Sequence, residues 1–344
     1  MSPTDKFKIA LKSILKRIPL LTKVVHWGRS IRSCDHRDIC LNQIRDSAVL
    51  CQLSMLNSEE ILNAIRENLL SYNLMKQNQT LRSVSYLRDL RELTLAHQTK
   101  VLQSAHPNPL NKFGKKCYSQ SDEDGLTLQV LSRINFLNGG VFAEFGVGDG
   151  TENNTLILKA LGWKGFWVGG EALAFEPSVK DFKYIREWIT LENIVSLAES
   201  GQQALSVSNI DVISLDLDGN DYYFVERLLN RGFSPKLFIV EYNAKFPPPV
   251  QWKIEYDPNH QWKGDDYYGA SLSSFVSLFE RHKYRLIVCN SHSGANAFFI
   301  RQDFDSAFED VPRDIDDIYV PPRYYLHESY GHQPSVKTIE RLFK

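Results

Sequence analysis

Long apolar runs, cysteine pairs and an excess of one charge are all missing from this 344-residue chain. No stretch reaches about 18 apolar residues, so we expect no helix that spans a membrane. The five cysteines form no C-x-x-C pair, which excludes the usual zinc motifs and a disulfide framework and is typical of a reduced, cytoplasmic protein. The formal net charge of −1 gives no field that attracts nucleic acid, so we expect no nucleic-acid partner.

Glycine is nearly absent from the first third of the chain, where residues 1–106 contain only Gly28. This region is rich in helix formers and shows no strand-like alternation, so we expect it to be all-helical. Two prolines in the run His106-Pro-Asn-Pro-Leu110 close it, because a helix does not continue through them. Beyond them, short β-branched or aromatic segments alternate with helical patterns. We therefore predict a helical region over 1–106 and an α/β domain over 107–344.

The first predicted helix is basic and amphipathic. Residues 1–33 carry eight lysines or arginines against one acid, Asp5. The apolar residues recur at spacings of three and four, and they are Phe7, Leu11, Ile14, Ile18, Leu21 and Val25. Such a helix binds an anionic membrane surface or docks on a protein. We predict that this helix docks on the body of the protein or on a partner, with peripheral contact of residues 5–32 at the inner face of a membrane as the alternative.

Two more helices are predicted before residue 106. Asn57-Ser-Glu-Glu60 resembles a capping box in front of an apolar run that ends at Leu69. A later apolar stripe consists of Leu81, Val84, Leu87, Leu90 and Leu93. Stripes of this kind pair helices in bundles and short coiled coils. We expect this region to hold protomers together or to dock a partner, and we predict a homo-oligomer.

The strongest functional signal is the run Val141-Phe-Ala-Glu-Phe-Gly-Val-Gly-Asp-Gly150. A short apolar strand there carries an acid, Glu144, and leads into Gly146, Gly148 and Gly150. Glycine accepts positive φ and lets a ligand approach the backbone closely. In an open α/β sheet such a turn lies at the carboxyl end of the first strand, where nucleotide-like ligands bind.

Acids follow the next predicted strands. The strand Gly165-Phe-Trp-Val168 ends near Glu171, which is placed to accept both ribose hydroxyls of a nucleoside, with Glu176 as the alternative. A third strand is predicted around Trp188-Ile189-Thr190. A fourth, Ile210-Asp-Val-Ile-Ser-Leu215, leads into a cluster of three acids, Asp216, Asp218 and Asp221.

Three acids so close together are costly without a cation or a basic partner. One interpretation is helix capping, by Asp218 or Asn220. The other is functional, as a Mg²⁺ site formed by Asp216, Asp218 and Asp221 or as a general base.

Polar side chains continue along the same predicted sheet edge. The strand Lys236-Leu-Phe-Ile-Val240 ends in Glu241, with Asn243 just beyond. The loop 252–268 interleaves aromatics with acids and amides, a composition that suits a sugar, and His260 is its only histidine. We treat His260 either as a general base or as an ordinary loop histidine. The strands 284–289 and 295–300 read as a closing hairpin, followed by an acidic C-terminal arm.

Residues 118–301 resemble the FkbM-type S-adenosylmethionine-dependent methyltransferases of class I. The pieces that carry the resemblance are Ser119-Gln120, Glu123-Asp124, Glu144-Phe-Gly-Val-Gly-Asp-Gly150, Asn154-Thr155, Leu161-Gly-Trp-Lys-Gly165 and Asp216-Leu-Asp-Gly219. The resemblance implies a Rossmann-like, mostly parallel sheet with a terminal antiparallel hairpin. It also implies S-adenosylmethionine as the cofactor and O-methylation of a sugar hydroxyl in a glycan or a glycosylated metabolite.

The site that follows from this resemblance has three parts. The predicted cofactor residues are Glu144, Gly146, Gly148, Gly150, Asn154, Thr155, Glu171 and Asp216. Asp218 or His260 is the predicted catalytic base, because a sugar hydroxyl has to lose its proton during transfer. Mg²⁺ at Asp216, Asp218 and Asp221 is the alternative means of activating that hydroxyl.

Two rival functions remain open. The chain could be a non-catalytic, cofactor-binding scaffold that recruits a glycan-assembly partner. An NAD(P)-dependent oxidoreductase could use the same sheet, although the E-x-G-x-G-x-G spacing differs from the dinucleotide fingerprint.

Overall fold

The computed structural model describes residues 80–323 and 331–344. The chain divides into two compact units, Met1–Gln98 and Thr99–Lys344, and the boundary falls within helix α6 (Thr80–Ala105). The predicted basic helix of residues 5–32 and the predicted capped helix of residues 57–69 lie outside the described residues. Within the described ranges, no helix is long and apolar enough to cross a membrane.

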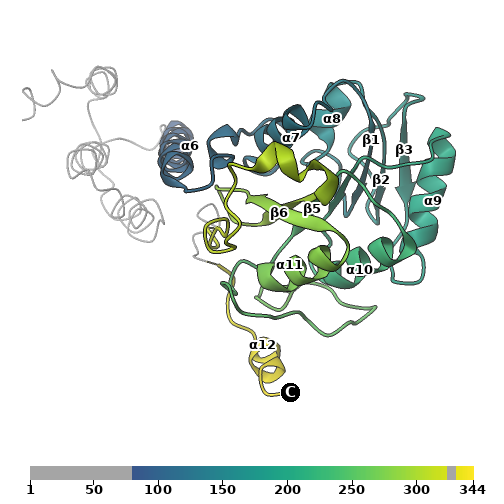
Figure 1. Cartoon of the computed structure of the whole chain (residues 1–344). Coiled ribbons are helices and arrows are strands. Elements are labelled where there is room, and N and C mark those ends of the chain that lie inside the picture. The colour runs from purple at the N-terminus through teal and green to yellow at the C-terminus, as the bar shows by residue number, and fades with distance from the viewer. Residues whose placement is uncertain (1–79, 324–330) are drawn as a thin grey trace, which may run out of the picture. The chain divides into compact units, whose positions relative to one another are not determined.

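A seven-stranded sheet forms the centre of the second unit (Figure 1). Its strands are β1 (Val141–Phe145), β2 (Lys164–Gly169), β3 (Phe182–Arg186), β4 (Val212–Leu215), β5 (Leu237–Glu241), β6 (Tyr284–Cys289) and β7 (Asn296–Arg301). The strand order is β3-β2-β1-β4-β5-β7-β6, and β7 runs antiparallel to both of its neighbours while the other pairs are parallel. This is the predicted mostly parallel sheet with a terminal antiparallel hairpin, so the prediction of a class I methyltransferase-type fold is confirmed.

Helices cover both faces of this sheet (Figure 1). They are α7 (Glu123–Arg133), α8 (Leu156–Ala160), α9 (Ile194–Leu205), α10 (Asp221–Arg231) and α11 (Leu272–Arg281). Figure 1 shows α7 and α8 on one side and α9, α10 and α11 on the other. The central strands β1 and β4 are buried along their whole length, which explains their continuous apolar runs.

The third strand is not where the sequence pattern placed it. Residues 188–190 form a loop, and β3 is formed instead by Phe182–Arg186. This strand lies at the edge of the sheet, and its charged residues Lys183 and Arg186 are exposed. Charges on an edge strand protect it from pairing with other chains, but they also dilute its apolar signal. The chain between β2 and β3 contains no helix.

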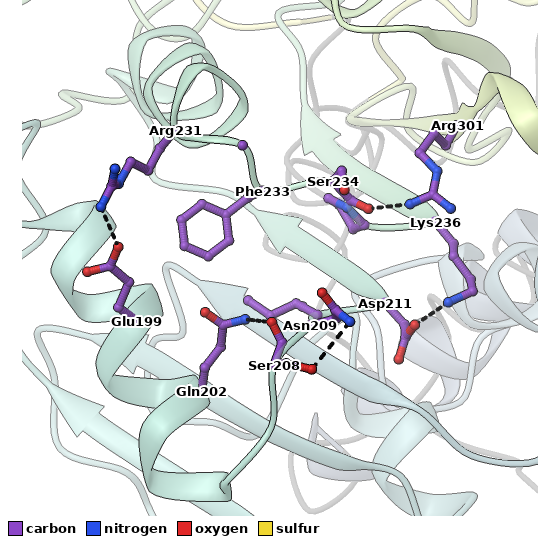
Figure 2. Close-up of a pocket in the computed structure, with 13 residues that line it drawn as sticks. Glu199, Gln202, Ser208, Asn209, Asp211, Arg231, Phe233, Ser234, Lys236 and Arg301 are labelled. Atoms are coloured by element: carbon purple, nitrogen blue, oxygen red, sulfur yellow. Dashed lines mark hydrogen bonds and ion pairs between the residues drawn. The ribbon is translucent and has the colours of Figure 1, made fainter.

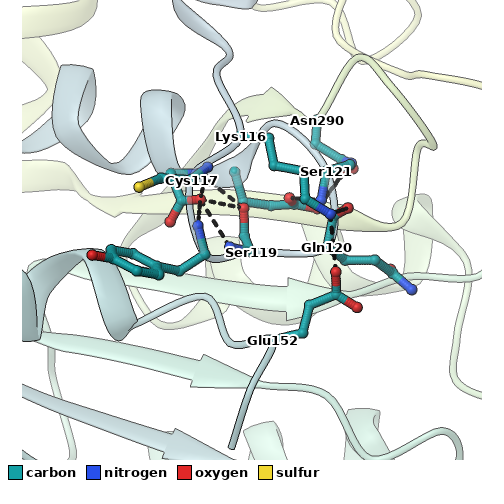
Figure 3. A network of polar contacts seen from close by, with 10 residues as sticks. Lys116, Cys117, Ser119, Gln120, Ser121, Glu152 and Asn290 are labelled. Atoms are coloured by element: carbon teal, nitrogen blue, oxygen red, sulfur yellow. Dashed lines mark hydrogen bonds and ion pairs between the residues drawn. The ribbon is translucent and has the colours of Figure 1, made fainter. Parts of the chain in front are cut away.

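Buried acids fasten the start of α7 to the chain around it (Figure 3). Asp124 Oδ2 accepts the backbone N–H groups of Cys117, Tyr118 and Ser119 at 2.7, 2.7 and 2.8 Å. Glu123 Oε1 accepts the side-chain amide of Asn290, the residue that follows β6, at 3.0 Å. These acids carry part of the family resemblance, and their contacts join the turn 117–121 to the closing hairpin.

We predict that Asp124→Ala lowers the free energy of unfolding by about 3 kcal/mol, because several backbone donors lose their charged acceptor. Urea unfolding followed by circular dichroism measures the change. The control is Glu152→Ala, which removes an ion pair to Lys116 between half-exposed side chains and should cost less than about 1 kcal/mol. Equal losses in the two variants would contradict the structural role of Asp124.

Candidate functional site

A cavity of about 370 Å³ lies at the carboxyl edge of the parallel strands. Its walls are the loop after β1, the end of β2, the turn after β4 and part of the loop 258–262. The predicted site residues that line it are Gly146, Gly148, Glu171, Asp216, Asp218 and His260. The structure thus brings together residues that are far apart in the sequence, as expected for strand ends that share one edge.

Close approach of two backbones requires the glycine at position 146. Gly146 has a φ of +94°, and a Cβ atom there would lie 1.6 Å from the carbonyl oxygen of Asp216. Gly148 differs, because a Cβ atom there would meet nothing within 4 Å and the residue is exposed in the cavity wall. Gly146 therefore shapes the loop, whereas Gly148 leaves space for a ligand.

Three predicted cofactor residues lie behind the loop and not in the cavity wall. Glu144 is buried and accepts the backbone N–H of Asn154 at 2.9 Å and that of Thr155 at 3.0 Å. The Thr155 hydroxyl donates to the same carboxylate at 2.5 Å. Burial raises the pKa of Glu144, and these donors oppose that rise. The three residues join β1 to the start of α8 and so support the glycine loop from beneath.

Gly150, the last predicted glycine, also lies outside the cavity lining. It has a φ of +82°, and a Cβ atom there would come within 2.8 Å of Leu173 and 3.0 Å of Trp167. Its role is the close packing of the loop against the segment that follows β2.

The end of β2 forms one side of the cavity. Glu171 is exposed there, and the Tyr184 hydroxyl lies 2.5 Å from its carbonyl oxygen and 2.9 Å from that of Gly169. Trp188, which is 55% exposed, and the buried Ile189 also line the cavity. Trp188 was not among the predicted site residues because the sequence pattern placed it inside a strand. Glu176, the alternative to Glu171, does not line the cavity.

Carboxylates from β4, α10 and β5 meet at the floor of this edge. Oxygen atoms of Asp216, Asp221 and Glu241 lie within 4.8 Å of one another. Burial raises the pKa of Asp216 and Glu241 well above the usual range, and repulsion by Asp218 and Asp221 adds to both rises. A hydrogen bond between the two carboxyl groups lowers the pKa of Asp216 and raises that of Glu241. Burial likewise raises the pKa of Asp221 to about 6. The cluster differs from the predicted set, because Glu241 takes the place of Asp218.

These three acids fit a hard divalent cation. Asp221 is held by the backbone N–H groups of Leu217 at 2.7 Å and Gly219 at 2.8 Å, which fixes its carboxylate. Glu241 Oε2 is buried without a hydrogen-bond partner among the described residues. Closely spaced carboxylate oxygens with free lone pairs are the donors that Mg²⁺ prefers.

The predicted side-chain cap of α10 is not formed. Asn220 is the residue before the helix, but its side chain makes no capping bond. It accepts the backbone N–H of Asp257 at 3.2 Å and donates to the Asp257 carbonyl at 2.8 Å. Asp218 is exposed in the cavity wall and has a φ of +52°. The turn after β4 thus positions the loop that carries His260.

His260 lies against that turn. A Cβ atom at position 219 would come within 2.4 Å of His260 Cδ2, so only glycine leaves room for the ring. Its Nε2 atom is buried and has no hydrogen-bond partner among the described residues. Burial lowers the pKa of His260, while Asp218 opposes that fall. A neutral imidazole with an unused nitrogen is able to accept a proton near pH 7.

Buried polar contacts hold the rest of this loop. Asn243 donates its side-chain amide to the carbonyl groups of Asp266 and Tyr268, at 2.9 and 3.0 Å. Asp266 pairs with Lys245 and accepts the hydroxyl of Thr338 from helix α12 (Val336–Arg341) at 2.7 Å. Asn243 therefore has a supporting role, and part of the C-terminal segment anchors the loop from outside.

A larger cavity of about 490 Å³ lies at the opposite edge of the sheet, beside the residues that precede β4 and β5 (Figure 2). No predicted site residue lines it. Its charged residues pair with one another, Lys236 with Asp211 and Arg231 with Glu199 at 3.3 Å. It has no connection with the glycine loop.

No protein-family model matches this chain, and no curated protein matches it in sequence. Solved structures do match. MycE of the mycinamycin biosynthetic pathway, in complex with Mg, S-adenosylhomocysteine and mycinamycin VI, is 15% identical with a TM-score of 0.34, covering 68% of this chain and 65% of MycE. A Plasmodium falciparum protein assigned as a ribosomal RNA methyltransferase is 11% identical with a TM-score of 0.33, covering 53% of this chain and 96% of that one.

A third structure is a family 2 O-methyltransferase from Planctomyces limnophilus, in complex with apigenin. It is 11% identical with a TM-score of 0.28, and the match covers 48% of this chain and 51% of that one. This chain therefore spans less than two thirds of the length of MycE and of the Planctomyces limnophilus protein. Similarity at this level assigns no activity, so the function is argued from the site itself.

We predict that, in a metal-free buffer, the acid cluster makes the free energy of unfolding fall as the pH rises from about 4 to about 7. An acid whose pKa is raised by folding contributes stability below its unfolded pKa and loses it as the pH passes the folded pKa, here about 6 for Asp221. Glu241→Gln removes one of the repelling charges, so the free energy of unfolding of this variant should fall by about 2 kcal/mol less over the same pH range. Urea unfolding with a chelator at several pH values measures the free energy of unfolding of the unmodified chain and of the variant. An equal fall with pH in the two proteins would contradict the repulsion between the acids.

Proposed function

We propose that this chain is an S-adenosylmethionine-dependent O-methyltransferase that acts on a sugar hydroxyl of a glycan or a glycosylated metabolite. The observation that carries the proposal is the convergence of a glycine loop, the strand-end acid Glu171 and Asp216, one member of the acid cluster, on one cavity at the carboxyl edge of the sheet. Ligands of open α/β sheets bind at this edge. The volume of about 370 Å³ lies in the usual range for small-molecule sites.

Each part of the cofactor has a suitable place in this cavity. The exposed carboxylate of Glu171 is positioned to accept the ribose hydroxyls, and Trp188 offers a flat apolar surface for the adenine ring. The methionine portion would lie along Gly146 and Gly148, where no side chain projects. Glu144, Asn154 and Thr155 then act indirectly, by holding the loop in shape.

The acceptor is assigned to the side of the cavity formed by the loop 258–262. Trp262 lines this side and is 39% exposed, and Gln261 beside it offers an amide to hydroxyl groups. An exposed aromatic ring beside polar groups suits the apolar face and the hydroxyls of a sugar. The acids in the wall would repel the phosphates of a nucleic acid.

Methyl transfer is an in-line displacement, so the main task of the protein is to align the acceptor oxygen with the methyl carbon. We assign His260, which lines the cavity, as the base that takes the hydroxyl proton. Burial lowers the pKa of its ring, and a hydrogen bond to the backbone of Asp218 opposes that fall. Mg²⁺, held by Asp216, Asp221 and Glu241, would supply charge stabilisation to the acceptor oxygen when bound.

Gly148→Arg should abolish the binding of S-adenosylhomocysteine without unfolding the domain. A side chain at position 148 meets no protein atom within 4 Å of its Cβ, so it fills the cavity instead of clashing. Isothermal titration calorimetry measures the affinity, and we expect about micromolar binding for the unmodified chain. The control is Ser200→Arg, on the exposed side of α9, which should bind normally. Unchanged affinity in Gly148→Arg, or binding of NAD(P)H in place of S-adenosylhomocysteine, would refute the assignment.

Mg²⁺ should raise the melting temperature by about 3 °C at ten times its dissociation constant. The shift should grow as the pH rises through about 6, because bound metal displaces the protons of the acid cluster. Glu241→Gln should lose the shift, whereas Asp218→Asn should keep it, because Asp218 lies outside the cluster. If Asp218→Asn lost the shift and Glu241→Gln kept it, the metal would instead bind the acids predicted from the sequence, Asp216, Asp218 and Asp221.

A further inference from the structure

A third cavity, of about 450 Å³, lies beside α10, α11 and the C-terminal helix α12. Three cations line it, Lys253, Arg281 and Arg341, and no carboxylate is found among its lining residues in the described chain. The neutral donors Gln251 and Ser277 complete its polar surface.

The three cations come from separate parts of the chain and are held in place. Lys253 Nζ lies 3.8 Å from the ring centroid of Tyr222, and Arg281 Nη2 lies 3.4 Å from the hydroxyl of the same tyrosine. Arg341 donates its Nε to the Lys253 carbonyl at 3.4 Å. Burial lowers the pKa of Lys253, the charge of Glu226 opposes that fall, and the charges of Arg281 and Arg341 add to it. The cations are therefore close enough to repel one another.

Nearby acids do not fill this cavity. Glu226 approaches Arg281 at 3.6 Å and Glu255 approaches Arg341 at 3.3 Å, but both glutamates lie outside the lining. The cavity in Figure 2 provides a comparison within the same molecule. It also contains three cations, but Glu199 and Asp211 line it and pair with two of them. In both cavities two cations have a carboxylate partner, but in the cavity at Lys253 these carboxylates lie outside the lining, so the lining itself offers positive charge to an anion.

We propose that the cavity formed by Lys253, Arg281 and Arg341 binds a phosphoryl group. Its polar lining offers guanidinium, ammonium, amide and hydroxyl donors, which match the several acceptor oxygens of a phosphate. The volume exceeds that of one phosphate, and Tyr222 and Trp252 form an aromatic wall, so the ligand class is a small phosphorylated molecule. This site is distinct from the glycine-loop cavity, and the two share no lining residue.

The segment that carries Lys253 is linked through Gly269 to the turn that follows β4. Ile254 donates its backbone N–H to the Gly269 carbonyl at 3.2 Å, and Gly269 donates to the Gly219 carbonyl at 2.9 Å. Tyr222, whose ring lies under Lys253, directly follows Asp221 in α10. A phosphoryl group would thus bind next to the segments that shape the first cavity without entering it.

Isothermal titration calorimetry with pyrophosphate, on the full chain at constant ionic strength, tests the proposal. We expect saturable binding that Arg281→Gln weakens at least about tenfold, because a charge-assisted hydrogen bond is lost. Arg281 is 57% exposed, so the substitution should not disturb folding, and circular dichroism verifies this. Lys253→Gln provides a second, independent variant from another part of the chain. Glucose 1-phosphate and phosphatidic acid vesicles then distinguish a soluble sugar phosphate from a lipid headgroup.

The matched control is Arg231→Gln, which removes a similarly exposed arginine that lines the cavity in Figure 2 and pairs with Glu199. It should bind pyrophosphate as the unmodified chain does. No binding of pyrophosphate, or equal weakening by Arg281→Gln and Arg231→Gln, would overturn the proposal. Binding of S-adenosylhomocysteine is measured in parallel and should be unchanged in all variants, so failure here is distinct from failure of the proposed activity.

Discussion

The burial of carboxylates at one edge of the sheet is the constraint on which this structure depends. A desolvated acid is costly unless donors surround it. Asp124 has three backbone N–H donors, Glu144 has two, and Asp221 has two. Each of these acids fixes the loop that supplies its donors. The loops around the first cavity therefore owe their shape to acids that do not themselves face the ligand space.

Asp216 and Glu241 break this rule. Both are close to Asp221, and burial together with repulsion by Asp218 and Asp221 raises the pKa of Asp216 and Glu241 well above the usual range. Two ways of relieving that repulsion exist, a shared proton or a divalent cation. Groups with strongly raised pKa values gather at functional sites, and one member of this cluster, Asp216, lines the first cavity.

The sequence predicts most of the sheet, because β1, β4 and β5 are buried runs of apolar residues, and it misses β3, because edge charges conceal that strand. It also predicts that residues at strand ends gather at one edge. It does not predict which of the acids come together in the cluster. Glu241 reaches Asp216 because β5 pairs with β4, and Asp218 lies outside the cluster in a turn where its φ is positive. Strand order and a single backbone angle are not visible in residue types.

The two sides of the first cavity are built by different forces. The side of the glycine loop depends on backbone contact, since a Cβ atom at Gly146 or at Gly169 would collide with carbonyl oxygens. The opposite side depends on side-chain hydrogen bonds. Asn220 and Asn243 donate to carbonyl groups of the loop, and Asp266 of the loop accepts the hydroxyl of Thr338. Backbone collisions tolerate little substitution, whereas side-chain anchors can be exchanged while the sheet stays intact. The loop side of the cavity can thus change its shape by substitution while the glycine loop is kept.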